Sequence, residues 1–333
     1  MRPGERQDAG TGVGAVGRLR QTGRLQQLVS AAGSLIGLLA LIVVLTVLSD
    51  NFLTVANLRN ISVQAAVIAI LAFGETYVIV AGGIDLSVGS VAGLAGIVMG
   101  WTFSNAGWPA GLAVLAGLVA GLLAGLVNAL LIGFGRLPAF IATLAMLSMA
   151  RGLALVISNG VPLGIPPWVS TLGSGAVGGL PYTTIVMLVA LAITAFVLRL
   201  TYAGRAMYAI GGNSEAARLS GVRVRRQQFV IYGLSGLFAA AAGILLAGRL
   251  ASAQPQAGTG YELDAIAAVV IGGASLSGGS GSALGTLIGA LILGVLRNGL
   301  TLLNVSAFWQ QFVIGAVIAV AVLLDTLRRR SVS

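Results

Sequence analysis

The hydrophobic and polar positions of this chain occur in long blocks rather than alternating residue by residue. Continuously apolar stretches rich in Ala, Leu and Gly are separated by polar connections. About 20 helical residues cross a ~30 Å hydrocarbon core, whereas strands of a membrane barrel would alternate apolar with polar side chains. The pattern predicts an all-α integral membrane protein with about ten transmembrane helices, at 28–49, 60–81, 86–103, 108–133, 137–157, 181–201, 227–250, 262–274, 282–301 and 306–327.

The eighth apolar segment, 262–274, differs from the others. It is too short to span a bilayer alone, and the glycine-rich stretch 272–281 adjoins it. Irregular backbone at membrane depth is tolerated only where protein or a water-filled cavity surrounds it. We therefore expect a broken or re-entrant helix here.

Two glycine-rich stretches resemble each other. Gly82–Ser90 aligns with Gly272–Ser280, with six of nine positions identical at a separation of 190 residues, and a weaker similarity relates Asn128 to Asn298. Duplicated halves with interrupted helices at matching positions are typical of transporters. Chance similarity in a Gly/Ser-rich chain is the alternative. The pattern does not distinguish a parallel from an inverted repeat.

The positive charge is distributed unevenly along the chain. All 19 basic residues are arginine, and 13 of them lie in the N-terminal tail, the loop 202–227 and the C-terminal end, whereas 158–181 has none. The positive-inside rule places both termini and the loop 202–227 in the cytoplasm. The net charge of +10 thus indicates topology and contact with anionic lipid rather than nucleic-acid binding.

These boundaries predict three parts. Residues 1–27 are expected to form a disordered cytoplasmic tail, 28–327 a single transmembrane domain and 328–333 a cytoplasmic arginine-rich end. Two cytoplasmic ends require an even number of crossings, which agrees with ten.

Composition removes several functional classes. Hydrophobic residues make up 57% of the chain, charged residues 8%, and mean hydropathy is +0.99. The chain has no Cys, His or Lys. These absences exclude His/Cys metal sites, histidine acid–base catalysis and a P-loop, whose lysine binds phosphate. A membrane enzyme is disfavoured, and no cofactor is expected in this chain. A self-contained, ion-coupled secondary transporter of a small polar solute remains an alternative.

The loop 202–227 contains the pattern of a short helix. Ser214 or Asn213 can cap its start, Glu215 suits its first turn, and Gly221 can end it. Small alanines on its surface suit docking in a groove of another protein. A helix resting on lipid headgroups is the alternative.

The same loop also matches a known motif. Residues 215–221 read Glu-Ala-Ala-x-x-x-Gly, which resembles the coupling-loop motif of ABC importer permeases, although the usual Ile-x-Leu-Pro ending is absent. The whole stretch AIGGNSEAARLSGV (209–222) and four others extend the resemblance to the permease of ribose/xylose/galactose-type ABC importers: GGIDLSVGS (82–90), RLPAFIATLAMLSMARGLAL (136–155), QPQAGTGYELDAIAAVVIGGASLSGGSGS (254–282) and NGL (298–300).

The resemblance implies a non-catalytic permease with a type II-like fold in the bacterial plasma (inner) membrane. Two copies would form the path for a monosaccharide that an external, periplasmic binding protein delivers. A cytoplasmic ABC ATPase would hold the ATP and Mg and bind the coupling loop. The coupling residues would be Gly211, Gly212, Asn213, Glu215, Ala216, Ala217, Arg218 and Gly221.

Polar residues inside a membrane are costly and are therefore functional candidates. Alternatively, the charged ones form structural pairs, Glu75 with Arg151 or Glu262 with Arg249, and Asp85 caps a helix that begins at Leu86. The translocation-path candidates are Glu75, Asp85, Ser87, Asn128, Arg151, Glu262, Asp264, Asn298 and Gln310.

Overall fold

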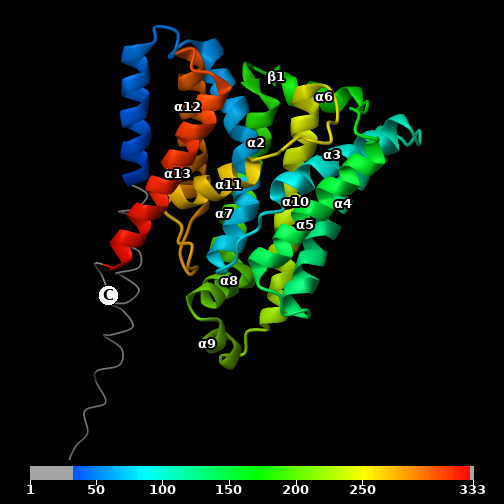
Figure 1. Cartoon of the computed structure of the whole chain (residues 1–333), viewed down its shortest axis with the longest axis vertical. Helices are drawn as coiled ribbons and strands as arrows, with labels where there is room; N and C mark the ends of the chain where they lie inside the picture. The colour runs from blue at the N-terminus through cyan, green and yellow to red at the C-terminus, as the bar shows by residue number, and fades with distance from the viewer. Residues whose placement is uncertain (1–32, 331–333) are drawn as a thin grey trace, which may run out of the picture.

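The computed structural model describes residues 33–330, and helices account for most of this range. The predicted tail 1–27 and residues 331–333 lie outside the described residues. A first helix, Gly33–Leu48, precedes those labelled in Figure 1. The labelled helices are α2 (Val55–Val80), α3 (Val88–Ser104), α4 (Ala110–Gly133), α5 (Ala139–Ser158), α6 (Pro167–Ser174), α7 (Tyr182–Leu200), α8 (Tyr202–Gly212), α9 (Ser214–Leu219), α10 (Val224–Leu250), α11 (Tyr261–Ile271), α12 (Ala283–Leu302) and α13 (Ala307–Arg330).

Each predicted apolar segment overlaps a helix. Six helices are long and apolar enough to cross a membrane, namely α2, α4, α5, α7, α10 and α12. Shorter apolar helices are Gly33–Leu48, α3 and the part of α13 from Ala307 to Val320. The chain therefore has the architecture of a multi-pass membrane protein, and the number of crossings stays a prediction.

Helix α2 forms the centre of the molecule. Every residue from Ala65 to Val80 is buried, and the helix packs against α7, α10, α11 and α12. A helix that is apolar around its whole circumference is stable only when protein or lipid surrounds it. Here protein surrounds it, and its end at Val80 is held inside the bundle.

Helix α4 differs, because one face contacts protein and the other is exposed and apolar. Its buried face carries Gly117, Gly121 and Gly125, which pack against α3 and α10. A methyl group added to Gly125 would lie 2.0 Å from the Tyr232 carbonyl oxygen. Small residues at this spacing let helix backbones approach closely in membranes. The GxxxG spacing of these three glycines thus sets the α4–α10 contact.

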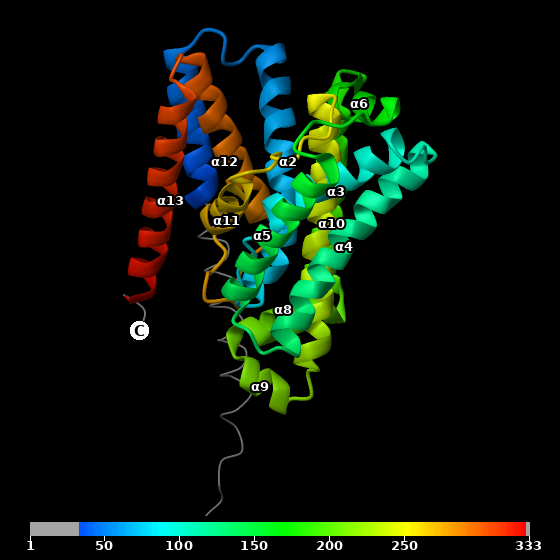
Figure 2. The same cartoon turned by 45° about the vertical axis from the view of Figure 1, so that its right-hand side comes forward.

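Helix α11 is the interrupted element that the sequence predicts at 262–274. Its eleven residues extend about 16 Å at 1.5 Å per residue, roughly half of a ~30 Å hydrocarbon core. In Figures 1 and 2 it lies near mid-height, inclined to its neighbours, and the loop 272–282 continues from it to the start of α12.

The connections gather at two opposite ends of the molecule. Figure 1 shows α8 and α9 at the lower end, toward which α13 also descends, and α6 at the upper end. Beside α6, strands β1 (Ala176–Val177) and β2 (Leu180–Pro181) form an antiparallel hairpin. The loop 202–227 and the basic-free segment 158–181 therefore lie on opposite sides.

The α4–α10 contact yields a prediction for stability. Gly121→Ala should lower the free energy of unfolding by about 1–3 kcal/mol, the usual range for overpacking, because the added methyl would lie 2.5 Å from both the Ala240 Cβ and the Gly236 carbonyl oxygen. Thermal unfolding of the purified protein in detergent measures this. Gly111→Ala on the same helix is the control, since its methyl would meet nothing within 4 Å. Equal stability of the two variants would contradict the proposed packing.

Candidate functional site

The short helix α9 is capped at both ends by its own residues. The Asn213 side chain accepts a hydrogen bond from the Ala216 N–H at 2.9 Å, so Asn213 is the N-cap rather than Ser214. At the other end Gly221 has φ +88°, and the N–H groups of Gly221 and Val222 donate to the carbonyls of Arg218 and Ala217. This is a Schellman ending, which favours glycine.

The outer surface of α9 is exposed. Glu215 and Arg218 form an ion pair at 2.5 Å, with side chains that are 65% and 61% exposed, and only Ala217 is buried. The hydrogen bond from Arg218 lowers the pKa of Glu215. The carboxylate is therefore charged at neutral pH, and the pair is lost only as pH falls through that lowered pKa. Ala216 is exposed rather than packed, as a docking surface requires.

Helix α8 connects α9 to the membrane part through its last turn. Gly211 is the contact point, because a methyl group there would lie 2.0 Å from the Val80 carbonyl oxygen and 2.5 Å from the Gly279 nitrogen. The Gly279 N–H itself donates to the Val80 carbonyl at 2.9 Å. One turn earlier, the Tyr208 hydroxyl donates to the Gly281 carbonyl at 2.8 Å. The end of α2 and the 272–282 loop thus meet at α8.

The two glycine-rich loops have related geometry. Helix α2 ends with the Gly82 N–H bonded to the Ile79 carbonyl at φ +82°, and α11 ends with the Gly273 N–H bonded to the Val270 carbonyl at φ +89°. This pairs Gly82 with Gly273, one residue away from the sequence alignment.

Further along the two loops, equivalent contacts are again 190 residues apart, as in the sequence alignment. The Asp85 carboxylate accepts from the Ser87 N–H, and the Ser275 hydroxyl accepts from the Ser277 N–H. Two chain reversals of similar construction therefore follow α2 and α11.

Four path candidates form a buried polar cluster around the first loop. The Asp85 carboxylate accepts from the Ser87 hydroxyl at 2.5 Å and from the Ser235 hydroxyl at 2.9 Å. Glu75 accepts from the Asp85 N–H at 3.0 Å, and Asn128 donates to the Ser87 hydroxyl at 3.0 Å. All five residues are at most 2% exposed. This cluster joins α2, α4 and α10 to the loop.

The structure corrects two structural interpretations of these residues. Helix α3 begins at Val88, and its N-cap is Ser87 without a side-chain cap bond, so Asp85 is not the cap of a helix at Leu86. Because the helix begins two residues later than predicted, the carboxylate instead closes the preceding turn, where it accepts from the Ser87 N–H and from the hydroxyls of Ser87 and Ser235. Among the described residues only two ion pairs form, Glu215–Arg218 and Asp264–Arg297. The Glu75–Arg151 and Glu262–Arg249 pairs are therefore both wrong.

Arg151 and Glu262 both contact the 251–260 loop. The Arg151 guanidinium donates to the carbonyls of Pro255 and Ala257 at 2.6 and 3.1 Å. Glu262 accepts from the Gly260 N–H at 3.2 Å. Both side chains are thus occupied with the backbone of the 251–260 loop, which explains why neither forms its predicted ion pair.

The remaining candidates make structural contacts. Asp264, in α11, pairs with Arg297 of α12 at 2.9 Å. Asn298 exchanges two amide hydrogen bonds with Asn57 at 2.8 and 3.0 Å. Gln310 donates at 2.9 Å to the carbonyl of Val305, just before the start of its own helix, α13. The sequence does not predict Asn57, which binds Asn298, or Ser235, which binds Asp85. Each is far along the chain from its partner, and neither belongs to a recognised motif.

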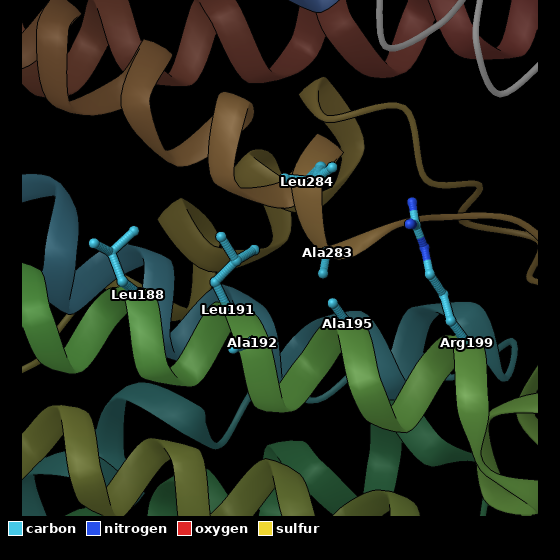
Figure 3. Close-up of a pocket in the computed structure, with 7 residues that line it drawn as sticks. All are labelled: Leu188, Leu191, Ala192, Ala195, Arg199, Ala283 and Leu284. Carbon is cyan, nitrogen blue, oxygen red and sulfur yellow. The ribbon is translucent and has the colours of Figure 1, made fainter.

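Two cavities differ in chemistry. A cavity of about 210 Å³ lies between α7 and the start of α12. Figure 3 shows leucine and alanine side chains around it, with Arg199 at one end. A second cavity, of about 370 Å³, lies between the end of α10 and the 251–261 segment and has polar side chains in its wall. None of the nine path candidates lines either cavity. The described residues also contain no cluster of three or more Asp or Glu suited to a metal ion.

Comparison with known proteins places this geometry in context. Residues 57–322 match the family described as branched-chain amino acid transport system, permease component. The ribose import permease protein RbsC of Bacillus subtilis (strain 168) is 47% identical over 311 residues, which is 92% of this chain and 95% of the relative. That of Escherichia coli (strain K12) is 47% identical over 301 residues, or 89% and 94%. The L-arabinose ABC transporter permease protein AraH of Azospirillum brasilense is 35% identical over 316 residues, or 95% and 93%.

The polar cluster yields a second prediction. Ser235→Ala should lower the free energy of unfolding by about 1–3 kcal/mol, because it leaves a buried carboxylate oxygen of Asp85 without its donor. Chemical denaturation in detergent measures the change. Ser148→Ala removes an exposed serine hydroxyl in α5 and should change stability by less than about 0.5 kcal/mol. A stability loss for Ser235→Ala no larger than for Ser148→Ala would mean that the Ser235 bond is not needed.

Proposed function

Because the chain belongs to the family of ABC importer permease components, we propose that it forms the path by which a monosaccharide crosses the bacterial inner membrane. The family description names branched-chain amino acids, whereas the similar curated proteins are named for ribose and L-arabinose import. Identity of 47% over more than nine-tenths of both chains favours a pentose, ribose first, over an amino acid.

The observation that carries this proposal is the connection between α9 and the glycine loops. An exposed helix, capped at both ends, is joined by α8 to the end of α2 and to the 272–282 loop at one backbone contact around Gly211. Movement of α9 is therefore passed to α2 directly and to α11 through the loop that follows it. Energy supplied from outside this chain can act at α9.

The partners follow from this role. A cytoplasmic ABC ATPase, holding ATP and Mg, binds the coupling loop 202–227 through the exposed residues of α9. A second copy of this chain completes the path, and an external binding protein delivers the sugar. The chain itself performs no chemistry. The termini and α8–α9 face the cytoplasm, in line with the arginines of the loop and the absence of basic residues in 158–181.

The finer architecture belongs to the same proposal. We place ten crossings in residues 28–327, counting α11 with its flanking loops as one interrupted crossing. The related turns after α2 and α11 support a pseudo-repeat of the two halves, in a type II-like permease. The buried cluster around Asp85 holds the first loop in place, and Arg151 and Glu262 shape the outer part of the path.

Reconstitution tests the function. Proteoliposomes that contain this chain with its ABC ATPase should take up radiolabelled ribose when ATP and the binding protein are supplied. Omitting ATP should abolish uptake. Ribose uptake by this chain alone, driven by an ion gradient, would establish the secondary-transporter alternative instead.

A third prediction concerns the end of α9. Gly221→Ala should reduce ATP-driven uptake severalfold while the protein remains in the membrane, because alanine at φ +88° is strained by about 1–2 kcal/mol and distorts the exposed helix. Uptake and ATP hydrolysis are measured together, and loss of uptake with continued hydrolysis marks uncoupling. Gly160→Ala is a matched control at the opposite end, with φ +75° and equally open surroundings. Full coupled uptake by Gly221→Ala would remove α9 from the coupling role.

A further inference from the structure

The larger of the two cavities lies on the side of the molecule opposite to α9. It is bounded by the end of α10, with Leu246, Arg249 and Leu250, and by Gln256, Thr259 and Tyr261 of the following segment. Helix α10 starts just after α9 and reaches the far end of the molecule, where it packs against α6 (Figure 2). The cavity volume of about 370 Å³ falls within the range of about 300–1,000 Å³ typical of small-molecule sites.

The polar side chains in its wall have free hydrogen-bonding capacity. Within the part of the chain that the structure describes, Arg249 forms no ion pair, and neither it nor the Gln256 amide makes a side-chain hydrogen bond. Thr259 donates to the Gln256 carbonyl at 2.8 Å, which leaves its oxygen lone pairs free. These donors and acceptors are exposed at the wall of the cavity and are available to a solute that enters it.

The wall is held in a fixed shape by contacts behind it. Arg151 of α5 donates to the carbonyls of Pro255 and Ala257. Ala253 and Leu163 exchange backbone hydrogen bonds at 2.9 Å, which ties the loop to the segment before α6. Gly258, at φ +76°, packs so closely on Gly89 that a methyl group would lie 2.5 Å from the Gly89 carbonyl oxygen. Such anchoring preorganises a site.

We propose that this cavity is a solute-binding site of the permease, in which Arg249, Gln256, Thr259 and Tyr261 bind the hydroxyl groups of a monosaccharide entering from the binding protein. The proposal rests on the proposed function and names a site for its substrate. A monosaccharide presents hydroxyl groups, each both donor and acceptor, on most of its carbons, which matches the mixed capacity of guanidinium, amide and hydroxyl groups. Leu246, Leu250 and the Tyr261 ring provide an apolar surface for its C–H face. The wall contains no carboxylate, so nothing in it favours a cation.

The absence of cysteine makes a direct test possible, because any thiol introduced into this chain is the only one. Thr259→Cys places a thiol in the cavity wall, and Val177→Cys places one on the exposed β1 hairpin at the same end of the molecule. The permease–ATPase complex in proteoliposomes is treated with a membrane-impermeant maleimide, with and without free ribose and without binding protein. Leu250→Cys is a second cavity variant if Thr259→Cys folds poorly.

The half-protecting concentration is the ribose concentration that halves the rate of labelling. At ten times this concentration, labelling of Thr259→Cys should slow about tenfold, since mass action leaves roughly one site in eleven empty. Labelling of Val177→Cys should not change. Adding Gln256→Ala should raise the half-protecting concentration about fivefold to tenfold, the effect of one lost hydrogen bond. This is the fourth prediction.

Three results would overturn the site. Labelling that ribose does not slow, in vesicles that still take up ribose when ATP and binding protein are added, removes the site and leaves the proposed function intact. Protection by unliganded binding protein but not by free sugar means that the cavity is a protein-docking surface. Absence of both protection and ATP-driven ribose uptake overturns the site and the proposed function together.

Discussion

The structure depends on one constraint, that backbone N–H and C=O groups inside a bilayer need partners within the protein. Helices α2 and α11 both end in turns that are packed against protein. Each end is closed by a glycine at positive φ and by a side chain that accepts from the N–H two residues on. The Gly279–Val80 hydrogen bond then joins one chain reversal to the other. These hydrogen bonds replace part of the helical bonding that the two interruptions remove.

The same constraint explains why glycine is required at particular places. At Gly211 three segments meet backbone to backbone, and a single methyl group would lie against a carbonyl oxygen of α2. Contact between backbones leaves no side chain that can change rotamer and absorb a displacement. A shift of α8 therefore has to move the end of α2 and the 272–282 loop with it. The junction consists of backbone contacts and of the Tyr208 hydroxyl bound to the Gly281 carbonyl.

Sequence alone predicted the helices well and the polar contacts poorly, for a physical reason. Apolar length is a local property, so all ten predicted segments overlap helices, and the caps of α9 were recognisable from Asn213 and Gly221. Polar pairing depends on which helices become neighbours, and the sequence does not contain that information directly. Asp85 bonds to Ser235, 150 residues away, and Asn57 to Asn298, 241 residues away. Neither contact repeats at a helical spacing or belongs to a motif.

The arginines show where this limit matters most. Their uneven distribution along the chain can be read from the sequence. It does not tell which arginine side chains bind backbone carbonyls of the protein and which have no partner in it. Arg151 is engaged with two carbonyls of the 251–260 loop, and Arg249, at the end of α10 next to α6, lines a pocket with no partner among the described residues. The sequence alone suggests a buried ion pair for each of them. Arg151 anchors the backbone on both sides of Gln256, whereas the side chains of Arg249 and Gln256 are exposed and unengaged, which is what the proposed binding of a hydroxylated solute requires.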